Sequence, residues 1–255
     1  MNPDQSAGVV LLNETGNELF KIGLINEASN YYKQAIRCLT GSRSQIAMTI
    51  QERQQCSSKL LHTNPDPISL QQYDGNIENF DSWHQISAMG VMFNIALVYS
   101  AANKIAEARS LLDLVLRAAA IQIPDIRDYN IFSEFLEEIE LMNYSERFAQ
   151  VVVHTLHLLG RIMCVQSSQV SLECNQLSED LDGGIMALVL AFKLGTSYLT
   201  QYHPVVACVC STLGHVLMQA HRFEEAMLTF EHAWSIAATV EVEVGKDFTS
   251  TAPAA

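Results

Sequence analysis

The sequence predicts an all-α protein built from pairs of helices joined by short turns. Only 12 glycines and 6 prolines occur in 255 residues, which is too few for an all-β chain with its frequent tight turns. Apolar residues make up 49% of the chain and charged residues 17%, so apolar burial can offset the entropy cost of ordering the chain. Four segments also repeat one pattern of small and aromatic residues, which indicates a repeated helical hairpin.

The first repeat, approximately 7–41, and the last, 204–240, match each other without a gap. The superposed pairs are Gly16 with Gly214, Ala28 with Ala226, Tyr32 with Phe230 and Ala35 with Ala233. Small residues let two helices approach closely where they cross, and the aromatic residue fills the space beside them. The pattern therefore predicts two helices of fixed length around one short turn.

The second and third repeats depart further from this pattern. In the second, 83–120, Ala96 stands at the position that Gly16 and Gly214 occupy in the other copies, which we call the glycine place. Ala108, Leu112 and Val115 follow it at the same offsets. In the third, 145–200, Ala187 follows Gly160 by 27 residues rather than 12, which leaves 15 extra residues in the turn. The sequence there is polar, and we expect residues 166–181 to form an exposed inserted loop.

Three further segments lie outside the repeats. Residues 41–82 are expected to be an insertion that ends in a loop, and residues 121–144 contain an acidic amphipathic helix. The tail, 241–255, is expected to be disordered. We expect residues 1–240 to form a single helical domain.

The repeat pattern resembles the tetratricopeptide repeat, and the last copy is similar to the repeats of kinesin light chains. The resemblance implies helix-turn-helix units that stack into an α-solenoid with an inner binding groove. The glycine places at 16, 96, 160 and 214 are 80, 64 and 54 residues apart, whereas the family repeats every 34 residues. We therefore expect an irregular solenoid.

In the family, the first helix of each repeat lines the groove, which gives a set of candidate peptide-binding residues. They are Asn13, Asn17, Phe20, Phe93, Asn94, His154, His157, Arg161 and His215. Chaperone-binding members hold a carboxylate with a lysine and asparagines. Asn17 and Asn94 occupy the asparagine places, but Asn13 stands where the lysine is expected, so chaperone tails are not expected ligands.

His154, His157, Arg161 and Cys164 follow one another at spacings of 3, 4 and 3, which places them on one helical stripe. One interpretation is that Arg161 and the histidines accept an acidic or carboxylate-bearing peptide. An equally weighted alternative is that the chain's own insertions cover this face. A metal site is disfavoured, because the stripe lacks a carboxylate and Arg161 would repel a divalent cation.

The remaining features exclude several classes of function. The net charge of −13 disfavours nucleic-acid binding, and no common catalytic or nucleotide-binding motif occurs. The longest apolar stretch, 149–165, contains two histidines and an arginine, so we expect a buried helix and no membrane insertion. The six cysteines form no CxxC pair and are expected to be buried free thiols in the cytoplasm or nucleus.

We therefore expect a non-enzymatic adaptor or scaffold, without cofactor or metal, that binds a protein partner as a peptide or helix. One alternative is a structural subunit held in a larger complex through its outer apolar surfaces. A metal-binding protein is a further, weaker alternative. The sequence leaves the oligomeric state and the partner open.

Overall fold

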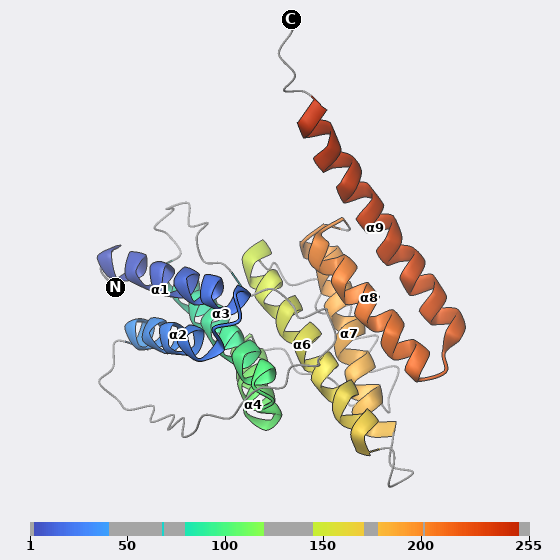
Figure 1. The fold of residues 1–255 in the computed structure, drawn as a ribbon, viewed down its shortest axis with the longest axis horizontal. Coiled ribbons are helices and arrows are strands. Elements are labelled where there is room, and N and C mark those ends of the chain that lie inside the picture. Colours follow the sequence, from blue (N-terminus) through green and yellow to red (C-terminus); the bar gives the residue numbers. More distant parts are fainter. Residues whose placement is uncertain are drawn as a thin grey trace, which may run out of the picture. The chain divides into compact units, whose positions relative to one another are not determined.

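The prediction of an all-α protein is confirmed by a computed structural model (Figure 1). The structure describes residues 3–40, 68, 80–119, 145–170, 178–200 and 202–249. Within these ranges there are eight helices and no strand. The acidic helix expected in 121–144 lies outside the described residues, as does the insertion 41–82 apart from Ile68, Phe80, Asp81 and Ser82.

The chain divides into two compact units, Met1–Ile121 and Gln122–Ala255, where we had expected a single domain. The first contains α1 (Pro3–Lys21), α2 (Ile25–Thr40), α3 (Phe80–Ala101) and α4 (Ile105–Ala118). The second contains α6 (Glu146–Val170), α7 (Ser178–Tyr198), α8 (Pro204–Gln219) and α9 (Phe223–Thr249). Each helix packs against its neighbour in sequence to form a hairpin, so each unit holds two hairpins (Figure 1).

Three of the hairpins share one turn, which lies at the same offset from the glycine place. The residue seven positions after the glycine place has a positive φ, with values of 84° at Gly23, 57° at Asn103 and 59° at His221. The N–H of the next residue donates to the carbonyl five positions earlier: Leu24 to Leu19 at 2.9 Å, Lys104 to Tyr99 at 2.8 Å and Arg222 to Leu217 at 2.9 Å. This left-handed closure of the first helix is a common helix ending, and here it recurs in register with the sequence repeat.

The glycine place makes room for the aromatic ring of the second helix. A Cβ atom added to Gly16 would lie 2.5 Å from the Tyr32 ring, and one added to Gly214 would lie 2.7 Å from the Phe230 ring. Both distances are far below an ordinary van der Waals contact. The repeat therefore pairs a missing side chain on one helix with a large ring on the other.

In the third hairpin, two glycines bring the helix backbones together. A Cβ on Gly160 would lie 2.9 Å from the carbonyl oxygen of Gly184, and a Cβ on Gly184 would lie 2.9 Å from that of Gly160. The Cys164 side chain packs against Gly184 and belongs to a core cluster with Leu188 and residues of α8 and α9. The crossing of α6 and α7 thus depends on both glycines.

Two expectations, about the insertion in the third repeat and about the tail, are wrong where the structure describes these segments. Residues 166–170 continue α6 and residues 178–181 open α7, so the inserted loop predicted over 166–181 is shorter at both ends. Residues 171–177 lie outside the described part. The tail was expected to be disordered from residue 241, but α9 continues as a helix to Thr249.

Helix α6 contains the single segment of the described residues that is long and apolar enough to cross a membrane, Glu146–Ser167. Of its most apolar window, 72% is buried inside the protein, where α6 packs against α7 and α8. A buried core helix passes the same test of length and composition. The apolar character of this segment is therefore accounted for by its packing.

Candidate functional site

Three of the candidate residues, Asn13 and Asn17 on α1 and Asn94 on α3, meet in the first unit. All three side chains are buried, and the structure brings them together although Asn94 lies 81 positions after Asn13 in the sequence. The Asn94 Nδ2 donates to Asn13 Oδ1 at 2.9 Å and to Asn17 Oδ1 at 3.3 Å. We call these three residues the asparagine site.

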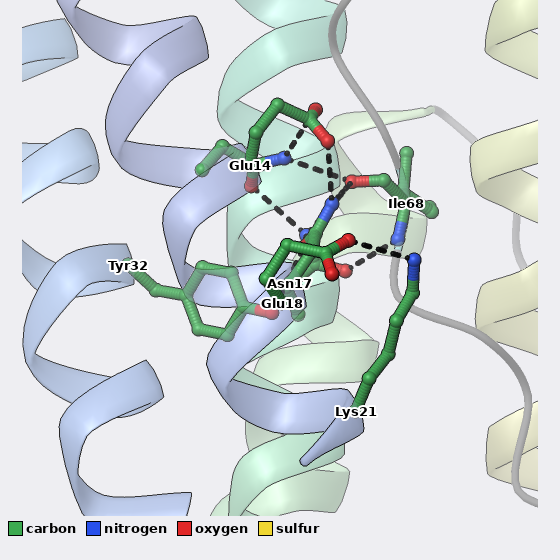
Figure 2. Close-up of polar contacts among 8 residues, drawn as sticks. Glu14, Asn17, Glu18, Lys21, Tyr32 and Ile68 are labelled. Atoms are coloured by element: carbon green, nitrogen blue, oxygen red, sulfur yellow. Dashed lines mark hydrogen bonds and ion pairs between the residues drawn. The ribbon is translucent and has the colours of Figure 1, made fainter. Parts of the chain in front are cut away.

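The asparagine site binds the main chain of Ile68 (Figure 2). The Ile68 carbonyl oxygen accepts from Nδ2 of Asn13 at 2.9 Å, of Asn17 at 3.1 Å and of Asn94 at 3.0 Å. The Ile68 N–H donates to Asn94 Oδ1 at 2.7 Å. Both polar groups of one peptide residue are therefore bound by side chains, and the Ile68 side chain is itself buried, with 4% of its surface exposed.

Tyr32 and Glu14 hold the asparagine side chains in place (Figure 2). The Tyr32 hydroxyl donates to Asn17 Oδ1 at 2.9 Å, and burial, with a smaller effect of Glu14, raises the pKa of Tyr32 so that the hydroxyl keeps its proton. Glu14 accepts from Asn17 Nδ2 at 3.2 Å and from Asn13 Nδ2 at 3.4 Å. Since the Tyr32 ring lies directly over Gly16, the repeat pattern itself places this hydroxyl at the asparagine site.

The arrangement can recognise a peptide without reading its sequence. A carboxamide carries a donor and an acceptor side by side, like a peptide group, and Asn94 uses both on one residue. In an extended chain the N–H and C=O of a residue point to the same side, as in a hydrogen-bonded pair of antiparallel strands. The Asn94 side chain therefore makes the two hydrogen bonds to Ile68 that a residue of a neighbouring antiparallel strand would make.

The two phenylalanine candidates do not form an exposed contact surface. Phe93, next to Asn94 on α3, is fully buried, and Phe20 on α1 is partly buried. Phe93 therefore contributes to the core of the first unit rather than to a surface that a partner could reach.

The histidine candidates on α6 are buried in the second unit, so they do not form the accessible stripe of the first interpretation. Burial, with a smaller effect of His203, lowers the pKa of His154 from 6.5 to about 4. Burial, with smaller effects of Arg161 and His154, lowers the pKa of His157 to about 3. Both imidazoles are therefore neutral at pH 7, and they add no positive charge to this face.

The hydrogen bonds of His157 fix its tautomer. Its Nε2 lies 2.8 Å from Thr212 Oγ1, and the Thr212 hydroxyl donates to the Cys208 carbonyl at 2.9 Å. Since that hydroxyl hydrogen is already used, Nε2 must carry the proton and donate to Thr212. The unprotonated Nδ1 is buried and has no hydrogen-bond partner among the described residues.

The other candidates of the second unit differ in exposure. Arg161 is partly buried, and its pKa is lowered by burial. His215 on α8 is exposed; its Nδ1 lies 2.7 Å from the Ser211 carbonyl, and its ring packs edge-on against Phe230. Cys164 lies in the core, and burial raises its thiol pKa to about 12. The side chains of the stripe are therefore not all accessible to a ligand.

Sequence reasoning missed Ile68, Tyr32 and Thr212 as partners of the candidate residues. Tyr32 was assigned to packing alone, although a buried tyrosine needs a partner for its hydroxyl. Ile68 directly follows the polar, proline-containing stretch NPDP, which could have indicated an anchored position. The contact of Thr212 with His157 depends on how α6 and α8 pack and leaves no signal in the sequence.

The described residues contain no group of three or more histidine, cysteine or acidic side chains that could hold a metal ion. Four cysteines lie in this part of the chain, and all are free thiols: Cys164 and Cys210 are buried, and Cys38 and Cys208 are exposed. The expectation of buried thiols is therefore wrong for the last two. Cys56 and Cys174 lie outside the described residues.

Comparison of the chain with family models, with curated proteins and with solved structures gives no match.

Proposed function

We propose that this protein is a non-enzymatic adaptor that binds a partner peptide on the face shared by α1 and α3. The observation that supports the proposal is the asparagine site, where three buried carboxamides hold both main-chain groups of Ile68. Such a site provides hydrogen bonds to a peptide backbone at a fixed position. The resemblance to tetratricopeptide repeats agrees with this function, and with an irregular α-solenoid as the architecture.

The proposed partner is a protein, not a nucleic acid, because the net charge is −13. We place the protein in the cytoplasm or nucleus, where free thiols persist. An acidic ligand at α6 would depend on Arg161 and His215, since the buried histidines are neutral at pH 7. The carboxamides of the first unit are therefore the better supported binding groups.

The test is affinity capture from the native source with mass spectrometry, using the wild type and two double variants. We expect Asn13→Ala with Asn94→Ala to lose the partner, because the main-chain hydrogen bonds are removed. Arg161→Ala with His215→Ala tests the second unit in the same way. Asn30→Ala, which changes an exposed asparagine on α2, is the matched control. A partner captured equally by the control and by the asparagine double variant would refute the proposal, and a loss confined to the Arg161 and His215 double variant would place binding in the second unit instead.

A second candidate function is a structural subunit of a larger assembly, and α9 favours it. Phe223, Met227 and Trp234 expose 55%, 58% and 77% of their surfaces, and spacings of 4 and 7 place them on one face of the helix. Apolar surface of this kind marks contact sites. Size-exclusion chromatography with light scattering separates the two functions, because a stable monomer is expected of the adaptor and obligate association of the subunit.

A further inference from the structure

We propose that Ile68 is an internal ligand of the asparagine site, and that a partner must supply an extended, uncharged peptide residue with an aliphatic side chain to replace it. This inference rests on the proposed function and specifies its ligand. In the free protein, Ile68 occupies the asparagine site of its own chain. A partner peptide must therefore compete with Ile68 for the site.

The chemistry of the ligand follows from the contacts of Ile68. Its carbonyl accepts from three carboxamides, and its N–H donates to the oxygen of one of them, Asn94 Oδ1, at 2.7 Å. An extended residue presents both groups to one side, so an extended peptide residue can make the same contacts. A proline could not supply the N–H, so the bound residue must be one with a main-chain donor.

The side chain and charge of the ligand are also restricted. Ile68 is buried, with 4% of its surface exposed, and a charged side chain at the same depth would carry a large desolvation cost. Glu14 lies beside the asparagines, at 3.2 Å from Asn17 Nδ2. A ligand carboxylate would meet a like charge there. The site therefore fits a residue inside a peptide, not a C-terminal carboxylate.

Occupation of the asparagine site by Ile68 is favoured because Ile68 is covalently linked to the helices that form the site. Residue 68 belongs to the same chain as α1 and α3, so its local concentration at the site is high compared with that of a free peptide. If the site is free in only a fraction of molecules, the apparent dissociation constant of a competing peptide rises by the inverse of that fraction. A site that is occupied in nine molecules out of ten would weaken binding about tenfold.

The test measures binding of a fluorescein-labelled peptide, NPDPISLQQ, which has the sequence of residues 64–72, to the full chain by fluorescence polarisation. Two variants open the site by different routes. Ile68→Asp makes its burial unfavourable, and Ile68→Pro removes the N–H donor. We expect both to bind the peptide about tenfold or more tightly than the wild type. Adding Asn94→Ala to either should abolish that gain, whereas adding the control Asn30→Ala should not.

The proposal is overturned if the wild type and both opened variants bind the peptide equally, or if none binds it at about 1 mM peptide. It is also overturned if Asn94→Ala has no effect in the opened variants. A second measurement does not depend on those variants: in protein labelled with ¹⁵N-isoleucine, the Ile68 amide should be protected from hydrogen exchange in the wild type. Asn94→Ala should remove that protection, and equal exchange in both proteins would contradict the proposal.

The outcome can be separated from that of the proposed function. If the peptide binds as expected but capture of the native partner is independent of the asparagines, the adaptor function fails and occupation of the site by Ile68 stands. If the partner is captured through the asparagines equally well by the wild type and by Ile68→Asp, the adaptor function stands and the competition fails.

Discussion

Replacing either glycine at the crossing of α6 and α7 by alanine should destabilise the second unit. A Cβ on Gly160 would lie 2.9 Å from the Gly184 carbonyl oxygen and 2.8 Å from the Leu188 Cγ; one on Gly184 would meet the Cys164 sulfur and the Gly160 carbonyl. Helix propensity alone favours alanine over glycine by about 1 kcal/mol. Overpacking of a core costs about 1–3 kcal/mol, and here the obstacle is partly backbone, so the two helices must separate.

We therefore expect Gly184→Ala to lower the free energy of unfolding by up to about 2 kcal/mol. Gly8→Ala is the matched control, because Gly8 lies within α1 and a Cβ there meets nothing within 4 Å. That variant should gain about 0.5–1 kcal/mol. Urea unfolding followed by circular dichroism measures both changes. If Gly160→Ala and Gly184→Ala stabilise the protein as Gly8→Ala does, the close helix crossing is refuted.

Three further predictions concern burial and pH. Because the pKa values of His154 and His157 are lowered from 6.5 to about 4 and about 3, the unfolded chain binds more protons below pH 6.5, and stability should fall there as pH decreases. Each histidine contributes about 1.4 kcal/mol per pH unit to this loss. His157→Leu should therefore reduce the pH dependence of the free energy of unfolding between pH 6 and 5 by about that amount. An unchanged pH dependence would contradict the burial of His157. Tyr32→Phe removes the hydroxyl that donates to Asn17 and should cost about 1 kcal/mol in urea unfolding, so a variant as stable as the wild type would argue against this hydrogen bond. Trp234→Ser should change the unfolding free energy by less than about 0.5 kcal/mol, since the side chain is 77% exposed, and a loss of several kcal/mol would show that another surface covers it.

The repeat pattern was sufficient to predict the hairpins, because its positions correspond to contacts between two helices that follow each other in the chain. A glycine on one helix and an aromatic residue 16 positions later describe one contact, and Gly16 with Tyr32 and Gly214 with Phe230 make it. The segment between the third pair of helices was misjudged for a related reason. Polar composition indicates exposure but does not distinguish a loop from a helix end, so residues 166–170 and 178–181 were assigned to a loop although they are helical.

The candidate site was only partly predictable. Helical spacing placed Asn13 and Asn17 on one face of α1, and the resemblance to chaperone-binding tetratricopeptide domains pointed to Asn94 on α3. Their common partner, Ile68, could not be found in this way, because its position depends on where an inserted segment returns to the helices. The histidines were predicted on one stripe, but spacing along a helix does not reveal which neighbouring helix covers it.

The sequence by itself determined the helical class, the hairpins and the register of their turns, because each depends on residues that are close in the chain and repeat at fixed offsets. The tertiary structure alone decided what those residues contact. It showed that the asparagines bind the main chain of residue 68 and that the histidines are buried and neutral at pH 7. Hydrogen bonds between segments 26 to 81 positions apart and the desolvation of a side chain are properties of the packed chain, and no local pattern encodes them.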